Sequence, residues 1–330
     1  MKETLDHLYG GNTLTKNEAQ EIMTRIGQNG CSEIEITSFL TVYLMRGITT
    51  GELAGFRDAL LELCLKVNLN GRKTIDVCGT GGDGKNTFNI STVSAFVVAG
   101  TGLPVAKHGN YGVSGPVGSS NLFEHFGYRF SSDEGKLKKE VDSAGITFMH
   151  APLFHPAMKY VAPVRKALQT KTFFNMLGPM INPALPEYQL VGVYSPEVQK
   201  LYADIYRQSG KKYMIIHTLD GYDEISLTGR TKIITAQEET IIDPSTFGME
   251  EAGQNELLGG KTTSEAADIL VNVLLNKGTT RQKQVVTANA AAAFKVVRPE
   301  ISWSDCVGMA SESIDSGRAY QSFKKLISLQ

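Results

Sequence analysis

Hydrophobic residues recur at helical spacing through the first 70 residues of the chain, and no alternation typical of a strand interrupts them. The spacing is clearest at Phe39, Leu40, Tyr43 and Leu44. Three capping boxes, in which a hydroxyl residue is followed three positions later by a glutamate, open such runs at Thr15, Ser32 and Thr49. The pattern therefore predicts a small all-helical domain over residues 1–70.

From residue 73 onward, short runs rich in β-branched residues alternate with helical stretches. Strands are predicted at residues 74–78, 103–107, 146–149, 189–193 and 213–216, with a helix at 91–99. A short strand at 233–234, a polar stretch and two or three long helices complete the chain. Such alternation is typical of an α/β fold, so we expect a larger α/β domain over residues 73–330 with a mostly parallel central sheet.

Residues 155–185 contain four prolines with helical stretches between them. This segment could pack on the α/β domain, or it could return to the N-terminal helices. Its pattern leaves both arrangements open.

The composition narrows the range of functions. The formal net charge is -1 at pH 7, so the chain has no global electrostatic reason to bind nucleic acid or an anionic membrane. No apolar run approaches the roughly 20 residues that cross a bilayer, and the first residues do not form a signal peptide. The four cysteines lie far apart and form no zinc or disulfide pattern. We expect a cytoplasmic protein with reduced cysteines.

The glycine-rich run Gly79–Gly84 directly follows a predicted strand and leads into a predicted helix. Glycines let the backbone approach an anion closely, and a helix start offers N–H groups and a favourable dipole. Asn89, Ser91 and Thr92 add side-chain donors. The run matches neither the Walker pattern nor G-x-G-x-x-G. It favours a phosphate or diphosphate site over a simple β-to-α turn.

A second polar segment, Lys107–Asn110, lies at the end of the next predicted strand. Ligands of parallel sheets bind at the carboxyl ends of strands. Lys107 offers a point charge for phosphate, and His108 and Asn110 can hydrogen-bond a substrate. The following residues, Gly112–Ser120, are rich in glycine and serine. We interpret them as a second phosphate-binding loop, with an ordinary surface loop as the alternative.

Carboxylates and one arginine complete the candidate chemistry. Asp223 and Glu224 follow a predicted strand and could hold Mg²⁺ together with substrate oxygens. Without the other segments, such a pair more often forms a solvent-exposed acidic turn. Arg165 lies on a mostly apolar helix. It could pair bidentately with a substrate carboxylate, or it could form a structural salt bridge.

Together these segments closely resemble those of the anthranilate phosphoribosyltransferases. The matching motifs are Gly79–Asp83, Asn89–Thr92, Lys107–Asn110, Asn175–Pro179 and Asp223–Glu224. Their order and spacing cover nearly the whole chain. Arg165 falls where the family places its ligand for the anthranilate carboxylate.

The resemblance implies a nucleoside phosphorylase/phosphoribosyltransferase-like fold, with part of residues 155–185 joining the helical domain and the active site in the cleft between the domains. It implies a magnesium-dependent transfer of the phosphoribosyl group from phosphoribosyl diphosphate to anthranilate, an early step of tryptophan synthesis. Two Mg²⁺ ions per active site and a homodimer formed through the helical domain are further expectations. An association with anthranilate synthase is left open, and neither nucleic acid nor membrane is an expected partner.

The resemblance also implies a role for individual residues. Those expected to bind phosphoribosyl diphosphate are Gly79, Gly82, Asp83, Thr87, Asn89, Ile90, Ser91, Thr92, Lys107 and Ser119. Those expected to bind anthranilate are Gly79, His108, Asn110, His155 and Arg165. Those expected to bind metal are Ser91, Asp223 and Glu224. No catalytic residue is assigned, and His108 is the one candidate for such a role.

The chain departs from the family pattern in one loop. Tyr111 stands where the family commonly has arginine, and Gly115–Pro116 stands where it commonly has Ser-Lys. Two positive charges are therefore missing from this loop. The alternatives are a pyrimidine nucleoside phosphorylase-like enzyme and a non-catalytic nucleotide-binding regulator. Lys107–Asn110 and the Asp223–Glu224 pair favour the transferase.

Overall fold

The structure is a computed structural model that describes residues 1–112 and 117–330, so Gly115 and Pro116 lie outside the described residues. The chain divides into two compact units. Unit 1 comprises residues 1–67 and 151–185, and unit 2 comprises residues 68–150 and 186–330. Unit 1 is therefore assembled from two segments that are distant in the sequence.

Unit 1 is helical. Its first segment forms α1 (Lys2–Tyr9), α2 (Lys16–Gly27), α3 (Glu33–Arg46) and α4 (Thr50–Leu63). Its second segment forms α8 (Ala151–Phe154), η1 (Pro156–Tyr160), α9 (Ala162–Leu168), α10 (Phe174–Leu177) and η2 (Gly178–Ile181). All three predicted capping boxes are present, because Thr15, Ser32 and Thr49 each accept the backbone N–H three positions later. Phe173 from the second segment packs against Phe39, Tyr43 and Phe56 from the first.

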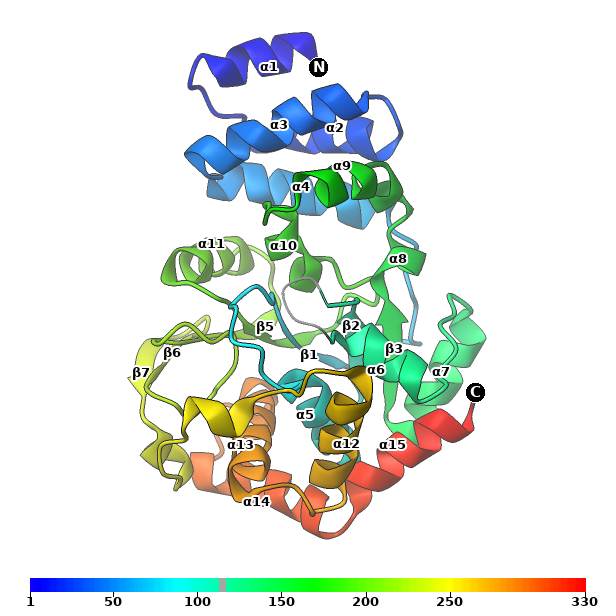
Figure 1. The fold of residues 1–330 in the computed structure, drawn as a ribbon, viewed down its shortest axis with the longest axis vertical. Helices are drawn as coiled ribbons and strands as arrows, with labels where there is room; N and C mark the ends of the chain where they lie inside the picture. Colours follow the sequence, from blue (N-terminus) through cyan, green and yellow to red (C-terminus); the bar gives the residue numbers. More distant parts are fainter. Residues whose placement is uncertain (113–116) are drawn as a thin grey trace. The chain divides into compact units, whose positions relative to one another are not determined.

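Unit 2 contains a seven-stranded sheet in the order β3-β2-β1-β4-β5-β6-β7 (Figure 1). The strands are β1 (Ile75–Gly79), β2 (Val105–Gly109), β3 (Ile146–His150), β4 (Tyr188–Gly192), β5 (Lys212–Thr218), β6 (Thr231–Ile234) and β7 (Glu239–Ile242). β1 to β5 are parallel to one another, whereas β6 is antiparallel to β5 and β7 is antiparallel to β6. The predicted α/β fold with a mostly parallel sheet is confirmed.

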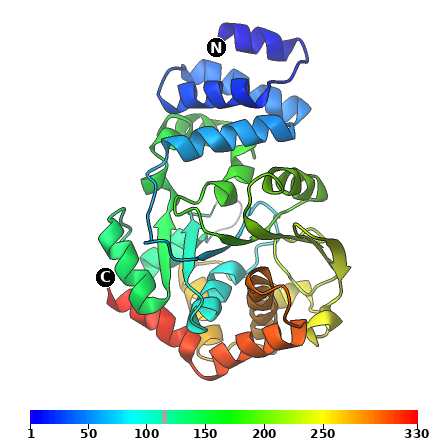
Figure 2. The same cartoon turned by 180° about the vertical axis from the view of Figure 1, so that it is seen from behind.

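Helices pack on both faces of the sheet. They are α5 (Ile90–Gly100), α6 (Ser119–His125), α7 (Glu134–Ala144), α11 (Pro196–Tyr206), α12 (Thr263–Leu274), α13 (Thr280–Val297), α14 (Trp303–Asp315) and α15 (Arg318–Ser328), with short turns η3 (Pro244–Phe247) and η4 (Gln254–Leu257). In Figure 2, α14 (orange) and α15 (red) lie along the lower edge of unit 2.

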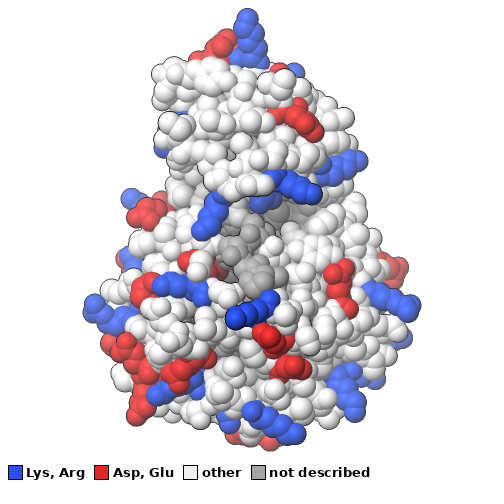
Figure 3. Space-filling view, in the orientation of Figure 1, with Lys and Arg blue, Asp and Glu red and all other residues white. Residues whose placement is uncertain are grey.

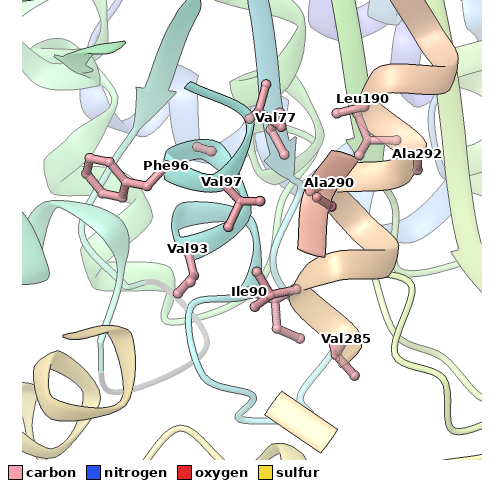
Figure 4. Close-up of a cluster of buried hydrophobic side chains, with 14 of the residues drawn as sticks. Val77, Ile90, Val93, Phe96, Val97, Leu190, Val285, Ala290 and Ala292 are labelled. Atoms are coloured by element: carbon pink, nitrogen blue, oxygen red, sulfur yellow. The ribbon is translucent and has the colours of Figure 1, made fainter. Parts of the chain in front are cut away.

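Alternation along the central strands separates an apolar face from a polar one. Val77 and Leu190 join Ile90 and Val97 of α5 and Ala290 of α13 in the main core (Figure 4). The next residues along the same strands, Asp76 and Gln189, are buried on the other face, where the Tyr206 hydroxyl of α11 donates to the Gln189 amide oxygen at 2.8 Å. The alanines of α13 lie against the small residues of α5, since a narrow side chain lets two helices approach closely.

Two sequence expectations for unit 2 need correction. The stretch after residue 234, interpreted as polar, contains strand β7, whose alternating side chains are buried only at Ile242. Four helices rather than two or three close the chain. The strand predicted at 103–107 begins at Val105, because Pro104 has no N–H to donate, and it continues through Gly109. Among the described residues, no helix is long and apolar enough to cross a membrane.

Candidate active site

The candidate site lies in unit 2, at the edge where the parallel strands end. The chain passes from β1 to β2 on one side of β1, and later returns to place β4 on the other side. Parallel sheets bind ligands where the strand order reverses in this way. Gly79 ends β1 and Gly192 ends β4, so the glycine-rich run predicted to bind phosphate starts at this position.

Asp223, in the turn after β5, packs directly on the two strand ends. Its Oδ2 atom accepts the Gly81 N–H at 2.6 Å. A Cβ atom on Gly79 would overlap with the Asp223 carboxylate, and a Cβ atom on Gly192 would overlap with the Asp223 carbonyl oxygen. The two glycines are therefore required for the turn to approach the sheet.

Glu224 connects this turn to α5 and β2. Its Oε1 atom accepts the Ser91 N–H at 3.2 Å. Lys107 is 2% exposed, and its ammonium donates to the Val77 carbonyl at 2.6 Å and to the Ser91 hydroxyl at 3.4 Å. The structure thus brings together Ser91, Lys107 and Glu224 from three different elements.

The two carboxylates of this turn are buried. Burial, followed by the charges of Asp83 and Glu224, raises the pKa of Asp223 well above its ordinary value. Burial also raises the pKa of Glu224 to about 7, against the opposing effect of Lys107. Carboxylates crowded away from water favour a bound cation, because a cation relieves both the burial cost and the mutual repulsion.

Two further atoms at this site fit a bound ligand. Within the part of the chain that the structure describes, the Thr80 hydroxyl and the Oδ2 atom of Asp83 are buried without a hydrogen-bond partner. The same residues contain no group of three or more histidine, cysteine, aspartate or glutamate side chains that could hold a metal alone. A Mg²⁺ ion fits this arrangement, since it takes few protein oxygens and completes its shell with water and phosphate.

The start of α5 differs from the expected row of free N–H groups. The N–H of Ile90 donates to the Phe88 carbonyl at 2.6 Å, that of Thr92 to the Asn89 carbonyl at 3.0 Å, and that of Ser91 to Glu224. The Ile90 side chain is buried in the core (Figure 4). The first turn of α5 is already paired within the protein, and Gly81, Gly82 and Gly84 with positive φ shape the loop before it.

The second predicted segment is split between a buried and an exposed part. Lys107 and His108 lie inside β2 and are buried, whereas Asn110 is exposed. The Asn110 carbonyl accepts the Ser120 N–H at 3.1 Å and the Ser119 hydroxyl at 3.4 Å. Asn110 and Ser119 are therefore neighbours at the end of β2.

Arg165 and His155 belong to unit 1. Arg165 lies on α9 with its guanidinium 5.4 Å from the ring centroid of Phe174, and burial lowers its pKa. No ion pair to Arg165 occurs among residues 1–112 and 117–330. His155 is buried, and desolvation lowers its pKa to about 4 despite backbone hydrogen bonds at Ile181 and Leu60. Its neutral ring is part of the interior of unit 1.

Sequence reasoning missed three residues of the site in unit 2. The sequence pattern places Thr80 in the glycine-rich run and Gly192 in a predicted strand, and it predicts no further role for either residue. Lys85 places its ammonium 4.7 Å from the ring centroid of Tyr222 and so connects the glycine-rich loop to the carboxylate turn. The Gly192 contact could not be found from sequence, because its partner Asp223 lies in another loop.

The surface agrees with the charge balance of the sequence. On the face drawn in Figure 3, basic and acidic side chains are interspersed in small groups. That face offers no broad basic stripe of the kind that binds nucleic acid.

Comparison with known proteins gives matches over both parts of the chain. Residues 2–64 match the glycosyl transferase family helical bundle domain, and residues 71–320 match the a/b domain of the same family. The anthranilate phosphoribosyltransferase of Christiangramia forsetii is 54% identical over 99% of this chain and 98% of its own length. That of Cytophaga hutchinsonii is 50% identical over 99% of this chain and 100% of its own length.

Solved structures give the same result. Anthranilate phosphoribosyltransferase from Thermus thermophilus superposes with a TM-score of 0.91 at 30% identity, covering 98% of both chains. The enzyme from Saccharomyces cerevisiae in complex with PRPP and Mg superposes with a TM-score of 0.91 at 27% identity, covering 98% of this chain and 96% of that chain.

Proposed function

The chain belongs to the anthranilate phosphoribosyltransferases, and from this membership we propose that it transfers the 5-phosphoribosyl group of phosphoribosyl diphosphate to the amine of anthranilate. The bond between C1 and the diphosphate oxygen breaks, and a bond from C1 to the amine nitrogen forms. Diphosphate and one proton leave. The reaction belongs to tryptophan biosynthesis.

One observation of the structure carries the proposal. The Asp223–Glu224 turn is bonded both to the glycine-rich loop at Gly81 and to the start of α5 at Ser91. The turn that we propose to bind metal and the loop that we propose to bind phosphate are thus in direct contact. This combination suits a donor whose leaving group is a diphosphate.

Magnesium would be held by Ser91, Asp223 and Glu224, with donor oxygens completing its shell, and we propose two ions per site. When bound, Mg²⁺ supplies positive charge that stabilises the departing diphosphate. A relative from Saccharomyces cerevisiae is described with PRPP and Mg, which supports this assignment.

The donor would be bound by Gly79, Gly82, Asp83, Thr87, Asn89, Ile90, Ser91, Thr92, Lys107 and Ser119. Because the Ile90 side chain is in the core, its contribution would come from the backbone. The Lys107 ammonium already donates to Val77 and Ser91. We therefore propose that Lys107 contributes mainly by its positive charge close to the bound donor.

Anthranilate would be held by Arg165 and Asn110, with Gly79, His108 and His155 nearby. A relative from Saccharomyces cerevisiae is described in complex with 4-fluoroanthranilate, which supports an aromatic acid as acceptor. The aniline nitrogen is already a usable nucleophile, so positioning contributes more than a strong base.

The test is a fluorescence assay of anthranilate consumption with phosphoribosyl diphosphate, in the presence and absence of Mg²⁺. We expect loss of anthranilate and equimolar release of diphosphate, both dependent on Mg²⁺. Phosphate-dependent release of a base from a pyrimidine nucleoside would instead identify a phosphorylase. Binding of the donor without turnover would identify a regulator.

We also propose that the protein is a homodimer formed through unit 1. Large apolar side chains are exposed on its first and third helices: Tyr9 is 61%, Ile34 80% and Met45 83% exposed. Burial of these side chains against a second copy would remove apolar surface from water. Sedimentation equilibrium of the wild type and of Met45→Lys tests this, and a monomeric wild type would contradict it.

A further inference from the structure

Asn121, in the first turn of α6, makes two hydrogen bonds with one side-chain atom. Its Oδ1 accepts the Gly118 N–H at 2.9 Å and the Gly112 N–H at 3.2 Å. The bond from Gly118 is one half of a capping box at the start of α6; the reciprocal bond is missing because glycine has no side chain. The bond from Gly112 is no part of a cap, because Gly112 lies before the helix and on the other side of the loop.

These bonds join two short segments that we call the stem, residues 110–112 and 117–120. The Ser120 N–H donates to the Asn110 carbonyl at 3.1 Å across the stem. A Cβ atom on Gly118 would overlap with the backbone of Gly112, Tyr111 and Asn110. The two segments are therefore packed backbone against backbone, with no room for a side chain.

The incoming side of the stem is fixed by Tyr111. The Tyr111 hydroxyl donates to Glu124 at 2.6 Å, and its ring packs edge-on against His150 with centroids 4.9 Å apart. The Tyr111 N–H donates to the Asn110 side-chain oxygen at 2.8 Å, which sets the orientation of that amide.

The outgoing side of the stem is connected to the residue that precedes α5. The Asn89 amide donates to the Val117 carbonyl at 3.0 Å. Ser119 is the next residue but one, and its hydroxyl would overlap with a Cβ atom on Gly109. Ser119 therefore packs directly on the end of β2, next to the bond that joins Ser120 to Asn110 across the stem.

We infer that Asn121 is a positioning residue for the transfer: by joining Gly112 to Gly118 it places Ser119 and Asn110 for the donor and the acceptor. The inference rests on the proposed function. Within the stem, Tyr111 stands where the family commonly has arginine, and its hydroxyl and ring hold that side of the stem through Glu124 and His150.

The test compares three variants in steady-state kinetics with both substrates varied. Asn121→Leu has a similar shape but accepts no hydrogen bond, and we expect it to raise the KM for phosphoribosyl diphosphate roughly tenfold. Asn121→Asp still accepts from both N–H groups, so its KM should stay within about threefold of the wild-type value. Asp133→Ala is the control, because Asp133 caps α7 of the same unit by accepting the Lys136 N–H at 2.7 Å.

Asp133→Ala should lower the melting temperature and leave both KM values unchanged, which separates positioning from general stability. Unchanged KM values for Asn121→Leu, or equal impairment of Asn121→Asp and Asn121→Leu, would overturn the inference while leaving the proposed function in place. A wild-type protein without transferase activity would overturn both.

Discussion

Arg165 is the residue whose role the structure sharpens most. The sequence allowed a structural salt bridge, but no ion pair to Arg165 occurs among the described residues. A half-buried guanidinium with no carboxylate partner is suited to bind the carboxylate of a substrate.

Arg165→Ala should therefore raise the KM for anthranilate roughly 10- to 100-fold, the range for a lost charged hydrogen bond, with the KM for phosphoribosyl diphosphate nearly constant. The measurement is initial rates with each substrate varied in turn. Lys166→Ala is the matched control, since Lys166 is the exposed neighbour on the same helix. Equal loss for both substrates would mean that Arg165 is structural.

His108 is the candidate for a proton-accepting role. We predict that His108→Ala lowers kcat by less than about 100-fold, the lower limit of what a lost general base costs, because the amine of anthranilate needs no strong base. Single-turnover rates with both substrates saturating give this value. A complete loss of turnover with intact binding of both substrates would assign catalysis to His108.

At the scale of elements, the end of strand β4 is in contact with the turn that contains Asp223. Gly192→Ala should displace the Asp223 turn, because the added methyl group would overlap with the Asp223 carbonyl oxygen. We expect a higher Mg²⁺ concentration for half-maximal activity, measured by titration of the transfer rate with Mg²⁺. Gly229→Ala, where nothing lies within 4 Å of the added atom, should behave as the wild type. An unaltered Mg²⁺ requirement in Gly192→Ala would contradict the packing argument.

The start of α4 is held by a fully buried carboxylate. Glu52 accepts hydrogen bonds from Arg46 at 2.5 Å, from the Tyr43 hydroxyl at 3.1 Å and from the Leu14 N–H at 3.0 Å. Burial would raise the pKa of Glu52, but the bonds from Arg46, Leu14 and Thr49 outweigh it and hold the pKa below its ordinary value of 4.5.

A lowered pKa means that Glu52 contributes stability above about pH 4.5, and that this contribution is lost as the pH falls through the lowered value. Glu52→Gln should cost about 3 kcal/mol of unfolding free energy at pH 7. The difference from the wild type should shrink toward pH 3. Urea unfolding followed by circular dichroism at both pH values measures it.

Glu35→Gln is the matched control for this experiment, because Glu35 makes the same capping box at the exposed start of α3. Its unfolding midpoint should change little at either pH. A Glu52→Gln effect that is the same at pH 7 and pH 3 would refute the electrostatic explanation.

The elements differ in how far the sequence could predict them. Strands β1 to β5 are short apolar runs between glycines and helices, so their pattern was sufficient. Strand β7 is paired on one side only by β6, and Glu239 and Thr240 make it look like a polar loop. The sequence pointed to the glycine-rich run, Lys107 and the Asp223–Glu224 pair, which the structure brings together, but contacts such as Asp223 with Gly192 depend on how segments distant in sequence meet. The bond from Gly112 to Asn121 is of the same kind.

At the scale of the whole molecule, ligand binding should be measurable as stability. A donor that binds only the folded protein stabilises it by RT ln(1 + [L]/Kd), so the melting temperature rises with the logarithm of the donor concentration once that concentration exceeds Kd. Phosphoribosyl diphosphate with Mg²⁺ should therefore raise the melting temperature more than either does alone, in differential scanning fluorimetry. Equal shifts with and without Mg²⁺ would mean that the donor binds without the metal.

The split of unit 1 into two segments has a consequence for synthesis on the ribosome. The central strand pair of the sheet, β1 with β4, joins residues 75–79 to residues 188–192. Every residue of unit 1 precedes residue 186. The nascent chain therefore presents a complete helical unit before the middle of the sheet can close, so β1, β2 and β3 must wait as an unfinished sheet whose β1 edge lacks its partner β4 while the helices assemble.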